Sequence, residues 1–304
     1  MKFHVNCNYL VHKGGPPDFV KFAQVADEFK YDYLRILDHV VGVVVDKHPD
    51  LPSTPYTHHS QFPEVFTLTA YLSAITSHIG FITGVIALPQ RQTSLVAKQA
   101  AEVDNLSAGR LMLGIGVGYN EIEFKAMGGT FKERGMLVEE QIGVLRALWS
   151  QESVSFKGRW HQLEHVNVSP LPQRGAIPIW MGAGRTAKPI PSPKILRRIG
   201  KFADGFMPLF AINETTGKLE EDAVEAWQFV CSSAEEAGRE PADIGLEISL
   251  YPFGKSQDQV LDEIGYLESL GVTNIHLRFP DADLTAQIRH IEEFIKIREQ
   301  VFIS

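Results

Sequence analysis

Two apolar stretches, IGFITGVIAL (residues 79–88) and LMLGIGVG (residues 111–118), decide the fold class of this chain. Neither stretch alternates apolar with polar residues, as a strand with one face in water does. Strands of a parallel sheet that is covered by helices on both faces have this composition. The two stretches therefore predict buried parallel strands.

Further short runs of β-forming residues alternate with helical patterns along the chain. The expected strands cover residues 2–8, 32–38, 80–88, 110–118, 178–182, 205–209, 245–251 and 274–279. Apolar residues recur at helical spacing over residues 18–30, 94–106, 134–149, 260–270 and 284–301. Eight strands that alternate with helices predict an α/β fold, the (β/α)8 TIM barrel; two doubly wound domains are the alternative. We expect a single domain over residues 1–304, because no Pro/Gly/Ser-rich linker divides the chain.

Two irregular stretches interrupt the alternation, at residues 40–63 and 151–177. Long loops in a compact domain are usually functional, and in a barrel the loops after the strands build the active site. Residues 40–63 directly follow an expected strand. We therefore expect them to form a lid in which Tyr56 and Phe62 exclude water and shape a substrate pocket.

The composition excludes several classes of protein. The 304 residues include 29 Lys and Arg against 37 Asp and Glu, a net charge of −8 with no basic block. Nucleic acid is therefore not expected as the main partner. No apolar stretch is long enough to span a bilayer and no secretory signal opens the chain, so we expect a cytoplasmic protein with no membrane partner. The two cysteines, Cys7 and Cys231, are expected to be reduced.

Asp38 and His39 end the second expected strand, where polar side chains of a barrel point to the active site. A carboxylate beside an imidazole suits proton transfer near neutral pH. The alternative is a loop aspartate followed by an exposed histidine.

Glycines in the third and fourth expected strands leave room for a flat ring. Gly84 lies between Thr83 and Val85 inside a strand, where glycine often marks a bulge or the close approach of a ligand, although it can also serve packing alone. Gly114, Gly116 and Gly118 share one face of the next strand. These positions are candidate contacts for a planar ligand.

The segment Gly182-Ala183-Gly184-Arg185-Thr186-Ala187 fits the GxGxxA pattern of dinucleotide-binding folds. Three prolines within residues 189–193 follow, so no helix can open inside the motif as that fold requires. The helix is instead expected to begin with Ser192 as N-cap and Pro193 at the first position. A glycine turn before a helix N-terminus, with Arg185 adding charge, predicts a phosphate site.

Metal and acyl-transfer chemistry have little support. His48, His58 and His59, with Asp46 and Asp50, match no known metal-site spacing, so we expect no metal. No GxSxG motif is present either.

The motifs together resemble the luciferase-like flavin oxidoreductase superfamily. The resemblance rests on residues 106–128 (LSAGRLMLGIGVGYNEIEFKAMG), 131–150 (FKERGMLVEEQIGVLRALWS), 155–163 (SFKGRWHQL), 177–184 (IPIWMGAG) and 202–209 (FADGFMPL). It covers roughly residues 1–210 and is greatest to the branch that depends on coenzyme F420, a deazaflavin; the FMN-using monooxygenase branch shares much of the pattern.

The resemblance implies a barrel in which the cofactor ring lies at the carboxyl ends of the strands. It implies a non-prolyl cis peptide at Gly84-Val85 that backs the ring, and a phosphate loop at Gly182, Ala183 and Gly184 with the following helix at Ser192. Together with the residue patterns above, the candidate cofactor contacts are Asp38, Thr83, Gly84, Val85, Gly116, Gly118, Gly182, Ala183, Gly184, Arg185 and Ser192. His39 and Asp38 are the implied catalytic pair, with Asp38 bonding the ring or setting the imidazole tautomer. One departure concerns the catalytic Glu of deazaflavin sugar dehydrogenases, because Tyr119 and Asn120 stand at its position here.

The expected activity is therefore hydride transfer between F420 and a small organic substrate. The alternatives are an FMN-dependent luciferase-like monooxygenase and a flavin-binding protein without catalysis. The resemblance also suggests a homodimer.

Overall fold

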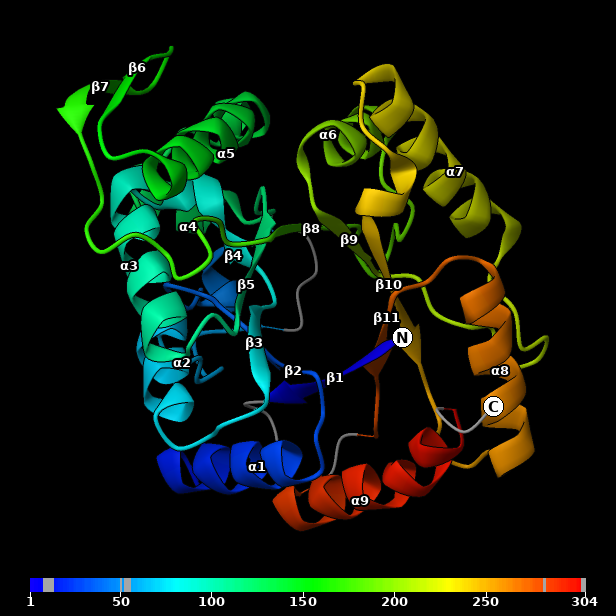
Figure 1. Ribbon diagram of the computed structural model, residues 1–304. Coiled ribbons are helices and arrows are strands. Elements are labelled where there is room, and N and C mark those ends of the chain that lie inside the picture. The colour runs from blue at the N-terminus through cyan, green and yellow to red at the C-terminus, as the bar shows by residue number, and fades with distance from the viewer. Residues whose placement is uncertain (8–13, 50, 52–55, 281–282, 302–304) are drawn as a thin grey trace. The chain divides into compact units, whose positions relative to one another are not determined.

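The computed structural model describes residues 1–7, 14–49, 51, 56–280 and 283–301. All eight predicted strand regions form strands, and the third is split in two (Figure 1). The strands are β1 (Lys2–Cys7), β2 (Tyr33–Ile36), β3 (Gly80–Thr83), β4 (Ile86–Ala87), β5 (Leu111–Gly116), β8 (Ile179–Ala183), β9 (Gly205–Pro208), β10 (Gly245–Leu250) and β11 (Asn274–Leu277). Their order is β3-β2-β1-β11-β10-β9-β8-β5-β4, and the order closes because β3 also pairs with β5. The predicted (β/α)8 barrel is confirmed.

The chain divides into two compact units, each discontinuous in sequence. Unit 1 consists of Met1–Arg35, Thr76–Gly80 and Ile179–Ser304, and unit 2 of Ile36–Ile75 and Phe81–Pro178. A single domain over residues 1–304 stays a prediction.

In the described part of unit 1, five α-helices lie outside the strands (Figure 1). They are α1 (Pro16–Glu28), α6 (Pro193–Phe202), α7 (Glu221–Glu236), α8 (Gln257–Ser269) and α9 (Leu284–Val301). Phe3 of β1 faces this layer, with its ring centroid 5.4 Å from that of Phe294 in α9. Gly205 is fixed by packing, since a Cβ there would lie 2.2 Å from the Trp180 indole. On β1, β10 and β11, apolar side chains alternate with polar ones, whereas β8 and β9 carry no charged or amide side chain.

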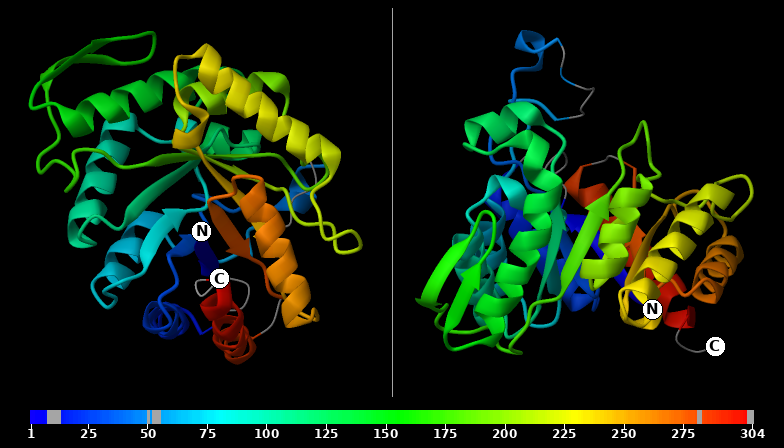
Figure 2. Two further views of the ribbon diagram at one scale, coloured as in Figure 1. Left: turned by 45° about the vertical axis from the view of Figure 1, so that its right-hand side comes forward. Right: turned by 90° about the horizontal axis from the view of Figure 1, so that it is seen from above.

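The described residues of unit 2 form four α-helices and a hairpin. The helices are α2 (Val65–Ser73), α3 (Thr93–Leu106), α4 (Glu121–Ala126) and α5 (Arg134–Ser150), and the hairpin is β6 (Val154–Lys157) with β7 (Gln162–Val166). The hairpin lies beside α5 (Figures 1 and 2). We expected residues 151–177 to be irregular, so β6 and β7 correct that expectation for part of the insertion.

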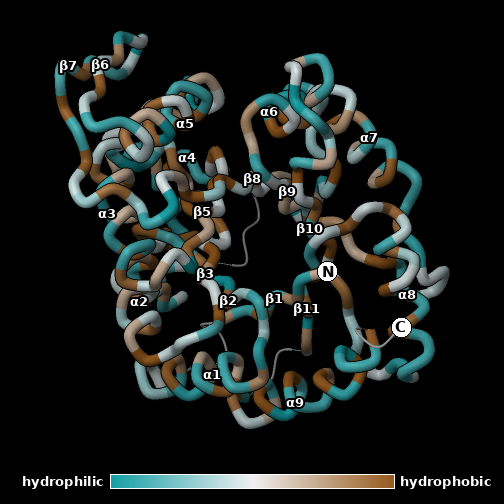
Figure 3. The backbone as a smooth tube through the Cα atoms, in the orientation of Figure 1, coloured by the Kyte–Doolittle hydropathy of each residue, from teal (hydrophilic) through white to brown (hydrophobic). Residues whose placement is uncertain are grey.

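Polar and apolar residues are interspersed along helices such as α8 and α9 (Figure 3). Among the described residues, no helix has the length and apolar character needed to cross a bilayer.

Candidate active site

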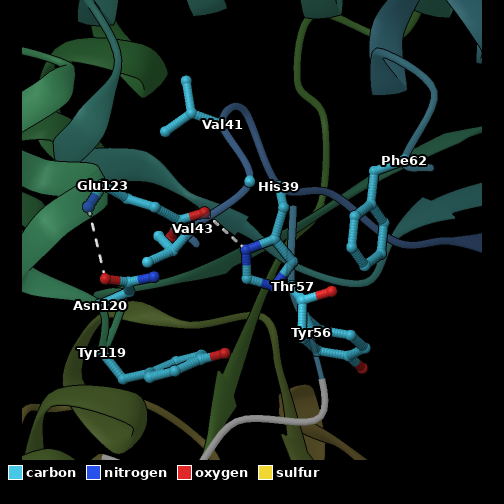
Figure 4. A pocket seen from close by; sticks show the side chains of 10 residues that line it. His39, Val41, Val43, Tyr56, Thr57, Phe62, Tyr119, Asn120 and Glu123 are labelled. Atoms are coloured by element: carbon cyan, nitrogen blue, oxygen red, sulfur yellow. Dashed lines mark hydrogen bonds and ion pairs between the residues drawn. The ribbon is translucent and has the colours of Figure 1, made fainter. Parts of the chain in front are cut away.

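His39 lies three residues after β2 and lines a small pocket in unit 2 (Figure 4). The pocket is formed by two segments that are distant in sequence, the predicted lid and the start of α4. Its lining residues are His39, Val41, Gly42, Val43, Tyr56, Thr57, Phe62, Tyr119, Asn120 and Glu123. The cavity measures about 10 Å³, room for about one water molecule. The His39 side chain is therefore already largely shielded from bulk solvent.

Glu123 is the hydrogen-bond partner of His39. Its Oε1 lies 2.7 Å from His39 Nδ1, and its Oε2 lies 3.5 Å from Gln90 Nε2. Glu123 is 4% exposed. Its position is set by the Asn120 N-cap, whose side chain accepts hydrogen bonds from the backbone N–H groups of Ile122 and Glu123 at 3.0 and 3.4 Å.

This contact fixes the protonation pattern of the imidazole. An ionised carboxylate only accepts, so Nδ1 carries the proton that points to Glu123. Nε2 is then the ring nitrogen that can gain or lose a proton. Sequence reasoning missed Glu123, although the segment NEIEF after the glycine-rich strand contained the signal: a helix N-cap with a glutamate at its third helical position.

Two aromatic residues of the predicted lid pack on His39. The ring centroids of Tyr56 and Phe62 lie 4.9 and 4.8 Å from that of His39, and 5.1 Å from each other. They thus enclose the imidazole, as expected of residues that exclude water. Residues 50 and 52–55 of the lid, Asp50 among them, lie outside the described part of the chain.

Asp38 does not contact the imidazole through its carboxylate. Both of its oxygens accept a hydrogen bond from Arg91 Nη2 at 2.9 Å. Burial raises the pKa of Asp38, and Arg91 offsets part of that rise. Glu123, rather than Asp38, bonds Nδ1 and so sets the imidazole tautomer, which corrects that part of the expectation. A cofactor contact from Asp38 stays a prediction.

The candidate ring contacts of unit 2 lie on β3, β4 and β5. The Gly84-Val85 peptide is cis, as the resemblance implies. Thr83 Oγ1 donates to the Gly114 carbonyl at 2.6 Å, and a Cβ on Gly114 would lie 1.9 Å from the Thr83 carbonyl oxygen. Gly114 thus serves strand packing and cannot be counted as room for a ligand.

Gly116 and Gly118 remain candidate contacts at the end of the same strand. Gly116 pairs with Ala87 of β4, and Gly118 follows β5 with φ +74°. A side chain on Gly118 would be strained by this backbone and would lie 2.8 Å from the Phe124 ring. The fold therefore requires glycine at position 118, whether or not a cofactor also lies against it.

The candidate phosphate loop lies in unit 1. Gly182 and Ala183 end β8, and Gly184 has φ +101°. Arg185 and Lys188 close a tight turn through backbone hydrogen bonds of 3.0 and 2.8 Å. Ser192 is the N-cap of α6, with Pro193 in the first turn as predicted, and its side chain makes no capping bond.

These residues fit a phosphorylated cofactor. Arg185, Lys188 and Lys194 are exposed cations around the N-terminus of α6, and the Ser192 hydroxyl is not used by the helix itself. Helix N-termini favour anions through their free N–H groups and the helix dipole. Gly184 also has a structural role, since a Cβ there would lie 2.5 Å from the Pro189 carbonyl oxygen.

The motif SFKGRWHQL forms the β6–β7 hairpin and is held by two glutamates. Glu140 accepts hydrogen bonds from the backbone N–H groups of Arg159, Trp160 and His161 at 2.8 to 2.9 Å. Glu133 pairs with the Arg159 guanidinium. The motif therefore anchors the hairpin to α5.

A family model described as luciferase-like monooxygenase matches residues 1–293. The chain belongs to this family.

One relative is the F420-dependent glucose-6-phosphate dehydrogenase of Rhodococcus hoagii. It is 29% identical over 251 residues, which are 78% of this chain and 64% of the relative. Two solved structures share the fold. A monooxygenase from Streptomyces bottropensis has a TM-score of 0.76 at 19% identity and covers 99% of this chain and 100% of its own. The F420-dependent tetrahydromethanopterin reductase of Methanopyrus kandleri has a TM-score of 0.70 at 18% identity, with 97% of each chain covered.

Proposed function

We propose that this luciferase-like protein transfers hydride between coenzyme F420 and a small organic substrate. The observation that carries the proposal is the His39–Glu123 pair, enclosed by Tyr56 and Phe62. A hydride transfer to or from an alcohol, enone or imine also moves a proton, and an imidazole with one nitrogen held by a carboxylate can supply or accept it. The F420-dependent relative supports this choice of cofactor.

Different side chains of the chain have separate roles in this proposal. Arg185 and Ser192 bind phosphate, and His39 Nε2 moves the proton. Tyr56 and Phe62 keep water from the imidazole, which prevents side reactions. F420, when bound, supplies the hydride acceptor or donor. We propose that the enzyme acts in the cytoplasm as a homodimer.

The first test is a titration of the purified apo-protein with F420 and, separately, with FMN. We expect saturable quenching of F420 fluorescence and at least tenfold weaker binding of FMN. Arg185→Gln should weaken F420 binding about three- to tenfold, because one charge-assisted hydrogen bond to phosphate is lost. Arg197→Gln, an exposed cation further along α6, is the matched control.

If the titration shows preferential binding of FMN, the proposed function changes. Tight FMN binding, with oxygen uptake by the reduced complex, would replace the proposal with a monooxygenase like the Streptomyces bottropensis neighbour. Binding of neither cofactor would remove the site assignment.

Glu123→Gln is expected to lower kcat about tenfold or more with little change in the F420 dissociation constant. The amide keeps the shape of the side chain but loses the charge that stabilises a protonated imidazole. Glu121→Gln, on the same helix but with an exposed side chain, is the control. Equal behaviour of the two variants would remove Glu123 from the mechanism.

A further inference from the structure

A short segment after β4 carries two side chains, Gln90 and Arg91, into the candidate active site of unit 2. Arg91 Nη2 donates to both carboxylate oxygens of Asp38 at 2.9 Å. Gln90 Nε2 lies 3.5 Å from Oε2 of Glu123, and Oε1 of Glu123 bonds His39 Nδ1. The position of this segment therefore affects the partners of two consecutive residues, Asp38 and His39.

The side chain of Gln141 holds this segment from α5. Its Nε2 lies 3.2 Å from the carbonyl oxygens of Leu88 and Arg91, and 3.0 Å from Thr93 Oγ1. The three acceptors span residues 88–93, which we call the 88–93 segment. A carbonyl oxygen only accepts, so the atom that faces these two carbonyls is the amide nitrogen. Gln141 is 1% exposed, so bulk water cannot replace these hydrogen bonds.

The Thr93 hydroxyl links Gln141 to the β6–β7 hairpin. It accepts from the Gln141 amide, which can only donate, so its own proton is directed to His161 Nε2, 2.6 Å away. His161 Nδ1 in turn donates to Glu140 Oε1 at 2.7 Å. Burial alone would raise the pKa of Glu140, but the hydrogen bonds from His161 and from backbone N–H groups lower it. The ionised carboxylate thus fixes the imidazole, and the imidazole fixes the Thr93 hydroxyl.

Other residues of α5 hold the helix and the hairpin in place. The helix packs through buried apolar side chains, which include Val138, Ile142, Leu145 and Leu148. The hairpin is anchored by the hydrogen bonds between Glu140 and its backbone. Among the described residues, the Gln141 side chain bonds the 88–93 segment alone, because its Oε1 has no partner there. Its hydrogen bonds therefore serve the placement of that segment.

We propose that Gln141 is a positioning residue for the proposed proton transfer. It fixes the segment that carries Gln90, and the Gln90 amide restrains the carboxylate of Glu123. With a partner on each oxygen, the carboxylate keeps Oε1 on His39 Nδ1 and leaves Nε2 as the nitrogen that exchanges the proton. The inference rests on the proposed function only in that His39 is the proton carrier.

The test follows the two ring nitrogens of His39 by NMR in the full chain with ¹⁵N-labelled histidine, without cofactor. The chain has 11 histidines, and His39→Ala identifies the His39 signals by their loss. With the ring in its neutral form, the ¹⁵N shifts report which nitrogen carries the proton. We expect the proton on Nδ1 in the wild-type protein, because Glu123 accepts it. A wild-type ring that is protonated on Nε2 would overturn the proposal.

Gln141→Met keeps the length of the side chain and removes its hydrogen bonds. We expect it to raise the ratio of Nε2-protonated to Nδ1-protonated His39 about three- to tenfold, the effect of one neutral hydrogen bond. Thr93→Val should change the ratio in the same direction, because it removes one acceptor of the Gln141 amide. Thr93→Ser keeps the hydroxyl and should restore the wild-type ratio.

Ile142→Val is the matched control, because Ile142 follows Gln141 on α5 and is buried, and its side chain cannot hydrogen-bond. It should lower the midpoint of thermal unfolding and leave the His39 ratio unchanged. An unchanged ratio in the folded Gln141→Met and Thr93→Val proteins would overturn the proposal. An equal change in Ile142→Val would overturn it as well, since general loosening of α5 would then be sufficient.

The proposed function fails separately, through the F420 titration. A proton position on His39 that depends on Gln141, in a protein that binds neither F420 nor FMN, would leave the positioning role standing and remove the redox activity. In a protein that turns over F420, Gln141→Met should also lower kcat about three- to tenfold, in step with the NMR ratio.

Discussion

Replacing His39 by alanine is expected to lower kcat about 100- to 10,000-fold, the usual contribution of a general acid or base. The His39 imidazole lies in the enclosed pocket. Its Nδ1 is 2.7 Å from the Glu123 carboxylate, and its Nε2 is the nitrogen that would face the substrate. The residues proposed to bind phosphate, Arg185 and Ser192, are on other segments. F420 affinity should therefore stay within a few-fold, and the loss should appear in kcat.

His59→Ala is the matched control, because His59 belongs to the same insertion but is exposed. Steady-state kinetics with F420 and the best available alcohol would provide the measurement, with thermal unfolding to confirm the fold of each variant. Unchanged turnover in the folded His39→Ala protein would exclude His39 as the proton carrier.

Replacing Glu247 by glutamine is expected to lower the free energy of unfolding by about 3 to 5 kcal/mol at pH 7, as for other broken buried ion pairs. Glu247 is 1% exposed, and its charge is compensated by Arg35 and His4. The variant would leave the Arg35 guanidinium buried without its anionic partner. Glu268→Gln, exposed on α8, should change stability by less than about 0.5 kcal/mol.

The pH dependence of this effect has a definite sign. Burial alone would raise the pKa of Glu247, but the Arg35 charge and the His4 hydrogen bond together hold it well below its usual range. A carboxyl group with a lowered pKa in the folded state stabilises the protein above its unfolded pKa, about 4.3. That stabilisation is lost as the pH falls below this value. We therefore expect urea denaturation of the wild-type protein and the Glu247→Gln variant to give a difference in the free energy of unfolding. This difference should be largest near pH 7 and decrease in acid.

A difference in the free energy of unfolding between the wild-type protein and the Glu247→Gln variant that stays constant from pH 7 into acid would contradict this pKa argument. It would show that the cost of the substitution comes from packing rather than from charge.

The strands and most helices could be predicted because their signals are local. Residues 111–116 are apolar at every non-glycine position and form a strand buried throughout. Ser192 and Pro193 start α6 as expected from their cap preferences. Several elements were not predicted individually: α2 and α4 are short, α7 was not recognised, and the β6–β7 hairpin has an exposed, polar second strand.

The sequence by itself determined the barrel, the position of His39 at the end of a strand and the start of α6 at Ser192 and Pro193 after a glycine turn. Each follows from the spacing of neighbouring residues and the backbone preferences of Gly, Pro and Ser. Only the tertiary structure decided which side chains pair. It joined His39 to Glu123 across 84 residues, turned Asp38 to Arg91 across 53, and left His276 Nε2 without a partner among the described residues. Such pairings depend on where separate elements meet, because a hydrogen bond requires two atoms within about 3 Å, and no local pattern specifies that distance.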